Sequence, residues 1–151
     1  MTEAQLADAL FGTSPREDSP YGAVRADSPY GAVRADSPYG AVRAEALLVE
    51  LDGAPQAAVI WYQSFNTWTG RPGLAVEDVY VREAYRGRGV GQAMFKYLAK
   101  LAVERGYARM EWSVLDWNTP ALEFYQSLGA TDQTDWRRYR LTGDALAALA
   151  A

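Results

Sequence analysis

The spacing of hydrophobic and polar residues changes along this chain, from strand-like runs to helical spacing. Apolar, strand-like runs cover residues 45–52, 56–63 and 75–82. Asp52 and Gly53 stand between the first two runs and form a hairpin signal, with a loop predicted to exceed two residues. The pattern therefore predicts three strands, the first two of them joined as a hairpin.

Helical spacing follows the third run. Residues 90–105 predict an amphipathic helix that ends near Gly106. Residues 119–128 predict a second helix, with Pro120 in its first turn and Gly129 as its stop. The apolar stripe of the first helix consists of Met94, Phe95, Leu98, Leu101 and Ala102.

Shorter elements complete the pattern. Thr2 can cap a helix that runs to about Leu10, and residues 110–115 predict a strand. A final strand is predicted at residues 136–141, and residues 144–150 are a possible terminal helix. The order of strands and helices predicts a mixed α/β fold.

A nine-residue unit, Asp-Ser-Pro-Tyr-Gly-Ala-Val-Arg-Ala, occurs three times without a difference, starting at Asp18, Asp27 and Asp36. Proline at the second position and glycine at the fourth favour a β-turn across Ser-Pro-Tyr-Gly. Residues 18–44 are either a tyrosine-bearing loop that reaches the active site or a neighbouring subunit, or an expanded surface loop.

Composition narrows the function. At 151 residues with 49% hydrophobic content, the chain is long enough for one domain with a real core. With no cysteine and no histidine, disulfides are impossible and a metal site of the zinc type is not expected. A net charge of −4 argues against nucleic acid as a partner. No membrane span or leader is visible, so we expect a cytoplasmic protein without a membrane partner.

A glycine-rich turn lies between the third strand and the long helix. Gly87, Gly89 and Gly91 alternate, which places Gln92 where a dinucleotide fingerprint needs its third glycine, and no P-loop lysine follows. Backbone N–H groups and the positive end of the helix dipole meet at such a turn. We expect a phosphate or pyrophosphate there, with an ordinary strand-to-helix loop as the alternative.

Residues 86–91, Arg-Gly-Arg-Gly-Val-Gly, resemble the acetyl-coenzyme A signature of the GNAT superfamily of N-acetyltransferases. Residues 1–12 and 44–151 look like its diamine (spermidine/spermine) branch, which includes thialysine acetyltransferases. The matching stretches are Thr2–Leu6 with Phe11-Gly12, Glu77-Asp78, Trp117–Pro120, Phe124-Tyr125, Gly129-Ala130, Trp136 and Tyr139–Leu141. The resemblance implies one domain over residues 1–151 with residues 18–44 as an insertion, a mostly antiparallel central sheet flanked by helices, and a homodimer.

The resemblance also implies a site for acetyl-CoA and a small primary amine. The backbone of the third strand would pair with the pantetheine arm, the glycine turn would hold the pyrophosphate, and the start of the second helix would touch the pantetheine. Asn118 is equally well explained as the N-cap of that helix. The expected cofactor-binding residues are Val79, Tyr80, Val81, Arg86, Gly87, Arg88, Gly89, Val90, Gly91, Gln92, Asn118, Ala121 and Tyr125.

Carboxylates and a phenol can carry the transfer. An alkyl ammonium must lose a proton before it attacks, so a carboxylate that binds the cation and relays its proton is useful. Glu77 and Asp78 are adjacent on a strand, so only one can point to a given face unless a bulge intervenes. The resemblance assigns Glu77 to amine binding and base work through water, and Tyr125 to protonation of the leaving thiolate. Each has a structural alternative: a solvated acid for Glu77, a core ring for Tyr125.

Acceptor specificity is less defined. Trp68, Trp117 and Trp136 could enclose a cation, although most Trp residues in a small domain are core. Asp135 matches an acceptor-side acid of the family, whereas Asn66 stands where polyamine-specific relatives carry an acid. A smaller amine or a thialysine-like acceptor therefore stays open beside the polyamines.

The sequence departs from the family pattern at its start. Relatives begin with a strand and a helix before the segment that matches Met1, so residues 45–52 are expected to be an open sheet edge. A dimer contact, a strand exchange or the repeat segment folding back could cover it. The alternative function is an inactive scaffold that self-associates through this edge or through the repeats.

Overall fold

The computed structural model of the protein describes residues 25–26, 32–34 and 44–151. The chain forms two compact units, residues 1–113 and 114–151, which are described separately. The helix predicted from Thr2 lies outside the described residues, and the single domain stays a prediction. Among the described helices, none has the length and apolar character to cross a membrane.

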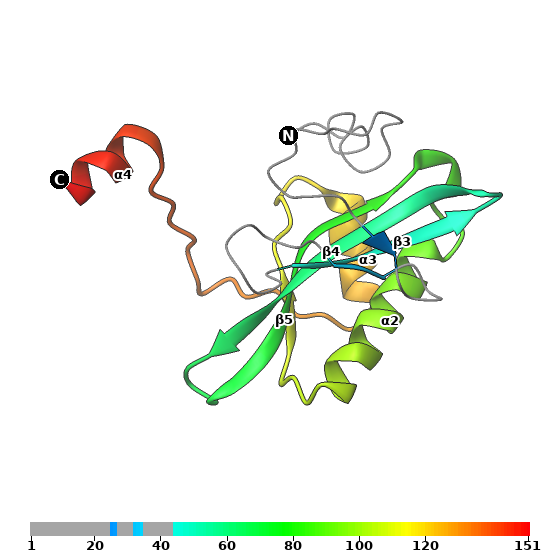
Figure 1. The fold of residues 1–151 in the computed structure, drawn as a ribbon, viewed down its shortest axis with the longest axis horizontal. Coiled ribbons are helices and arrows are strands. Elements are labelled where there is room, and N and C mark those ends of the chain that lie inside the picture. Colours follow the sequence, from blue (N-terminus) through cyan, green and yellow to red (C-terminus); the bar gives the residue numbers. More distant parts are fainter. Residues whose placement is uncertain (1–24, 27–31, 35–43) are drawn as a thin grey trace. The chain divides into compact units, whose positions relative to one another are not determined.

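Six strands described in the first unit form one sheet in the order β1-β2-β3-β4-β5-β6. Strands β1 to β5 pair antiparallel, whereas β6 runs parallel to β5. Figure 1 shows the long strands β3, β4 and β5, which confirm the mixed, mostly antiparallel sheet. The strands are β1 (Arg25–Ala26), β2 (Ala32–Arg34), β3 (Glu45–Leu51), β4 (Ala54–Asn66), β5 (Arg71–Val81) and β6 (Met110–Trp112).

A tight hairpin joins β3 to β4. Leu51 stands opposite Ala54, so the loop is Asp52-Gly53 alone, and the longer loop predicted from the sequence is wrong. Asp52 has φ 55° and Gly53 has φ 76°. Positive φ at both positions is typical of the two-residue turn whose twist matches the flanking strands, and Asp-Gly suits it.

One face of the sheet is covered by α2 (Val90–Glu104), which runs along β4 and β5 (Figure 1). The predicted boundaries are confirmed, because Arg105 caps the helix and Gly106 follows with φ 67°. Phe95 packs edge-on against Trp112 with ring centroids 5.0 Å apart. The core on this face consists of Leu47, Ala57, Val59, Trp61, Leu74, Val76, Met94, Leu98 and Ala102.

The second unit contains α3 (Thr119–Ser127) and α4 (Gly143–Ala150). Both predicted helices are therefore confirmed. The strand predicted at residues 136–141 is wrong: these residues form no strand, and Tyr139 is 89% exposed. A strand requires a partner for its backbone groups, and residues 114–151 include no other strand that could supply one.

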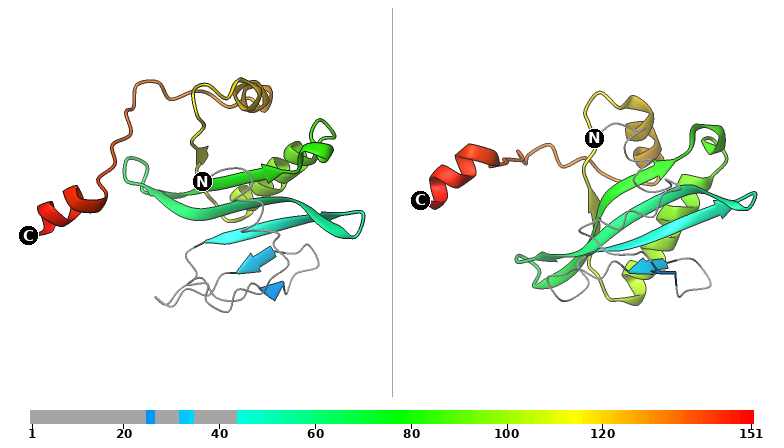
Figure 2. Two further views of the ribbon diagram at one scale, coloured as in Figure 1. Left: turned by 90° about the horizontal axis from the view of Figure 1, so that it is seen from above. Right: turned by 45° about the horizontal axis from the view of Figure 1, so that its top comes forward.

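The repeat segment pairs with the first three residues of the edge of β3, Glu45–Leu47. β2 comes from the second copy and pairs with β3, and β1 comes from the first copy and pairs with β2. Figure 2 shows these two short blue strands beyond β3. Of the three ways suggested for covering residues 45–52, the structure shows the repeat segment folding back.

Candidate active site

A β-bulge in β5 decides where the two adjacent acids point. Asp78 stands opposite Ile60, but Val76 stands opposite Trp61, so Glu77 is the extra residue. Val76 belongs to the core under α2, and Val79 packs against that core. Side chains alternate along a strand, so each acid points away from the core valine next to it. Glu77 and Asp78 therefore lie on the same face of the sheet, opposite α2, whereas strand alternation alone predicted only one of them on a given face.

The charge of Glu77 acts on the carboxyl group of Asp78. Glu77 is exposed, whereas Asp78 is half-buried. Burial, and to a smaller extent the nearby charge of Glu77, raises the pKa of Asp78 above its ordinary value. A cation placed beside the pair would relieve both effects, so the pair is suited to bind an ammonium group and to accept a proton from it.

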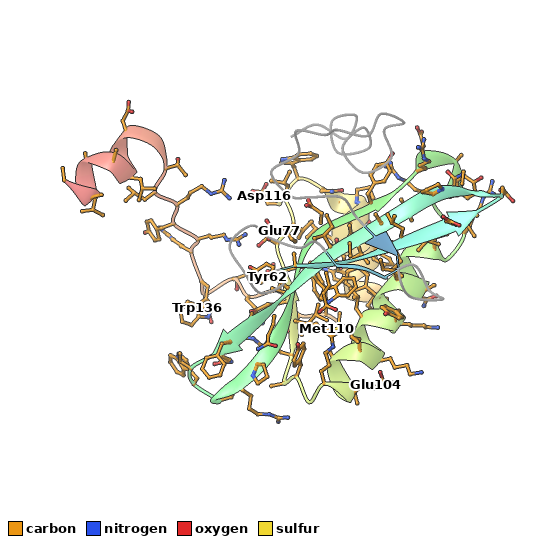
Figure 3. The ribbon with its side chains drawn as sticks, viewed as in Figure 1. Tyr62, Glu77, Glu104, Met110, Asp116 and Trp136 are labelled. Carbon is orange, nitrogen blue, oxygen red and sulfur yellow. The ribbon has the colours of Figure 1, made fainter. Side chains whose placement is uncertain are left out.

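Tyr62 shares the face of the acid pair and was not among the residues predicted for the site. Its neighbour Trp61 is 1% exposed in the core, so Tyr62 points to the other side of β4. Tyr62 stands opposite Ala75, two residues before Glu77, and Figure 3 shows Tyr62 and Glu77 near one another on adjacent strands. Alternation with a buried tryptophan was the signal that could have found it.

The partner strands of β5 end at different points. On the β4 side, pairing continues to Val81, whereas β6 pairs with β5 only over Leu74–Val76. The ladder with β6 thus stops at the bulge, just before the acid pair. The expected pantetheine-binding residues, Val79, Tyr80 and Val81, lie beyond that point on β5.

The glycine turn leads directly into the first turn of α2. Gly89 is the N-cap with φ 82°, and Gly87 has φ 70°. The first helical hydrogen bond is from the N–H of Ala93 to the carbonyl of Gly89, at 2.9 Å. The amides that precede Ala93 in the helix, those of Val90, Gly91 and Gln92, are the ones that a helix leaves without an internal acceptor. These are the amides from which the sequence predicted an anion site.

The side chains of two arginines make contacts at this turn. Arg86 Nε donates to the Val81 carbonyl at 2.9 Å, which ties the turn to the end of β5. The Arg88 guanidinium carbon lies 5.2 Å from the centre of the Tyr85 ring. The short helix η1 (Glu83–Tyr85) precedes the turn. Arg86 therefore has a clear structural role beside the cofactor role expected for it.

Tyr125 lies on α3 in the second unit, half-buried beside Phe124, with the two ring centroids 5.3 Å apart. Both rings are half-buried, so Tyr125 is not a fully buried core ring. Burial raises the pKa of Tyr125, which keeps its phenol protonated at neutral pH. A general acid needs that protonated form.

The other expected site residues of the second unit have different surroundings. Asn118 is the N-cap of α3, but its side chain makes no capping hydrogen bond, so the capping explanation holds only for its backbone. Ala121 lies in the first turn of α3 and is half-buried. Trp117 and Trp136 are each 72% exposed, and Asp135 is exposed. None of the three is a core residue.

Asn66 and Trp68, the two remaining residues considered for the acceptor site, lie at the tip of the β4–β5 hairpin. Asn66 Oδ1 accepts hydrogen bonds from the N–H groups of Trp68 at 2.9 Å and Thr69 at 3.4 Å. Asn66 therefore has a turn-forming role, which an aspartate could also fill. Trp68 itself is 88% exposed.

Two curated proteins are similar in sequence to part of this chain. The L-ornithine N5-acetyltransferase NATA1 of Arabidopsis thaliana is 41% identical over 91 residues, which is 60% of this chain and 40% of the relative. The thialysine N-epsilon-acetyltransferase of Bos taurus is 36% identical over 113 residues, which is 70% of this chain and 66% of the relative. The chain thus spans less than two thirds of the length of each.

A solved structure and a family model cover more of the chain. An integron cassette protein from the mobile metagenome of V. cholerae superposes with a TM-score of 0.72 at 21% identity, over 97% of this chain and 85% of that one. At that identity the likeness supports the fold alone. The model of the acetyltransferase (GNAT) family matches residues 9–130. The chain therefore belongs to the GNAT acetyltransferase family.

Proposed function

We propose that this protein transfers the acetyl group of acetyl-CoA directly to the primary amine of a small cationic acceptor. The observation that carries the proposal is the bulge at Glu77, which puts two carboxylates on one face of β5 where its ladder with β6 stops. A cation-binding acid pair thus adjoins the strand segment expected to hold the acyl donor.

The donor would be held mainly by backbone groups. The amides of Val90, Gly91 and Gln92 would bind the pyrophosphate at the positive end of α2. The segment Val79–Val81 would pair with the pantetheine arm, and one of its amides would polarise the acetyl carbonyl. A well-placed donor of this kind accelerates acyl transfer by about 100-fold to 1000-fold.

The chemical step needs the acceptor nitrogen to lose two protons and the leaving thiolate to gain one. The ammonium of the acceptor gives a proton to the acid pair or to a water held by Glu77, and the neutral nitrogen attacks the thioester carbonyl. The carbon–sulfur bond then breaks, and the Tyr125 phenol protonates the departing thiolate. The nitrogen releases its second proton to solvent as the amide forms, and Tyr125 regains its own proton from solvent. The products are the N-acetyl amine and free CoA.

The acceptor is proposed from the charge of the site and from the relatives. Ornithine and thialysine, the acceptors in the two relatives' names, both carry a primary amine on a short chain. Two carboxylates on one face of β5 suit such a cation, and the side chain of Asn66, engaged in a turn, adds no further negative charge. We therefore favour a short amine over a long polyamine. The homodimer and the cytoplasmic location remain predictions.

The decisive experiment follows free CoA with a thiol reagent during incubation with acetyl-CoA and a panel of amines. The panel contains ornithine, thialysine, a diamine, spermidine and a lysine-containing peptide. The protein has no cysteine, so it contributes no thiol background. We expect turnover with the short amines and weaker turnover with spermidine.

Binding of acetyl-CoA by calorimetry separates the possible failures. Micromolar binding without turnover on any amine would leave the cofactor site and reject the acceptor class. Turnover on the peptide alone would indicate a protein acetyltransferase. An absence of binding would favour the inactive scaffold.

A further inference from the structure

The three copies of the nine-residue unit do not contribute equally to the sheet. The first copy is residues 18–26 and contains β1, and the second is residues 27–35 and contains β2. The third copy, residues 36–44, leads directly into β3 and contains none of the described strands.

The pairing register explains why the third copy cannot do what the second does. Arg34 stands opposite Glu45, and residues 35–44 connect them. The equivalent residue of the third copy is Arg43, which only Ala44 separates from Glu45. An antiparallel hairpin needs a loop of about two residues or more, so Arg43 cannot pair with Glu45.

We propose that the repeat is a strand-supplying unit whose copy number sets how many strands extend the sheet beyond β3. The copy next to β3 serves as the connection, and each earlier copy adds one strand. One copy would leave the edge of β3 open, two copies would give one added strand, and three copies give the two that are present, β1 and β2.

The first copy can also replace the second. If Arg25 took the place of Arg34 opposite Glu45, the connection would lengthen to residues 26–44. Loop closure becomes less favourable only slowly with length, and this change alone corresponds to about a threefold loss in probability. The edge of β3 therefore has two interchangeable partners, and a gain or loss of one whole copy leaves the register unchanged.

Covering this edge has a physical consequence. An open strand edge exposes unpaired N–H and C=O groups and can pair with a second chain. β3 has seven residues, and β4 already occupies its other side. The added strands should thus keep β3 from pairing with another copy of the protein.

Deletions test the copy-number rule in the full chain. Removing any one copy gives the same sequence, because the copies are identical. We expect hydrogen exchange in residues 45–47, the part of β3 that pairs with β2, to stay within about threefold of the parent after deletion of one copy. Deletion of two copies should accelerate it about tenfold or more and should promote self-association in light scattering.

Pairs of prolines test the same rule without changing the length. Adjacent amides of a strand point to opposite neighbours, so two consecutive prolines remove one donor on each side. The variants are Ala23→Pro/Val24→Pro in the first copy, Ala32→Pro/Val33→Pro in the second, and Ala41→Pro/Val42→Pro in the third as the matched control. Thermal unfolding checks that each variant folds.

Protection of β3 should survive prolines in any single copy, because either of the first two copies can cover it and the third only connects. It should be lost when the first and second copies carry prolines together. Loss from prolines in the third copy alone would overturn the assigned roles, and loss from the second copy alone would overturn interchangeability. Unchanged protection in both the two-copy deletion and the combined variant would overturn the proposal as a whole.

Discussion

Arg105 and Glu45 join the C-terminal end of α2 to the first residue of β3 by a two-point ion pair. Arg105 Nη2 donates to Glu45 Oε2 at 2.8 Å, and Nη1 donates to Oε1. The hydrogen bond to Glu45 raises the pKa of Arg105. Glu45 also stands at the place where β3 meets both β2 and β4, so the pair ties the helix to the edge of the sheet.

Breaking this pair should lower stability measurably. Glu45→Gln removes the carboxylate but keeps the shape of the side chain, and we expect the free energy of unfolding to fall by about 1 kcal/mol, because the pair is bidentate and only partly exposed. Urea unfolding measures the change. The control is Lys100→Gln, which removes an exposed pair with a 3.7 Å separation between Lys100 Nζ and Glu104 Oε1. A loss as large in the control would show that the geometry of Arg105 is unimportant.

The acid pair should show its coupling in a titration. Glu77→Gln removes the smaller of the two causes that raise the pKa of Asp78 and leaves burial in place. The midpoint of Asp78, followed by NMR of its carboxyl carbon, should move to lower pH without reaching its ordinary value. Glu111→Gln is the control, since Glu111 pairs with Arg109. An unmoved midpoint in Glu77→Gln would mean that the two carboxyl groups do not interact.

The same pair gives stability a defined dependence on pH. The folded state raises the pKa of Asp78, so the ionised carboxylate slightly destabilises the fold near neutral pH. Asp78→Asn should therefore unfold at a somewhat higher temperature at pH 7. As the pH falls through the raised pKa and below the ordinary value of 3.8, this gain should disappear. The thermal midpoints of the two proteins at pH 7 and pH 3 give the comparison.

Tyr125→Phe tests the proposed acid. The change removes one hydroxyl, so kcat should fall about 100-fold or more while the dissociation constant for acetyl-CoA changes little. Steady-state kinetics and calorimetry measure the two quantities. Tyr139→Phe in the same unit is the control, because Tyr139 is 89% exposed. Full turnover in Tyr125→Phe would remove the acid role.

The dependence of the reaction rate on pH in the alkaline range gives a second test of the acid role of Tyr125. Its raised pKa keeps the phenol protonated beyond the ordinary value of 10.0. Activity that depends on this proton should therefore persist to at least that pH and decline above it. A decline well below pH 10 on a stable protein would indicate that another group carries the proton.

Substitutions at two glycines distinguish an effect on stability from an effect on cofactor binding. Gly89 has φ 82°, where an alanine is strained, so Gly89→Ala should lower stability by about 1 kcal/mol. Gly91 lies in the first turn of α2, where alanine favours the helix. Gly91→Ala should raise stability slightly, yet weaken acetyl-CoA binding about tenfold by holding the pyrophosphate away from the amides. Unchanged binding in Gly91→Ala would place the anion elsewhere.

Local signals identified most of the secondary structure. The apolar stripe through Met94 and Leu98 predicted α2 and its buried face, and Gly106 and Gly129 marked the ends of two helices. These features depend on residues close together in sequence. The strand predicted at residues 136–141 failed because a strand exists only with a partner, and alternation along one segment does not specify a partner.

The sequence by itself determined the types of the main elements, the glycine turn and the chemical groups available for acyl transfer. Only the tertiary structure decided that Glu77 and Asp78 share a face, that Tyr62 joins them, and that two copies of the repeat pair at the edge of β3. The physical reason is that a bulge and a strand register arise from hydrogen bonds between distant segments. Such pairing is fixed by which strands meet, and no local periodicity encodes it.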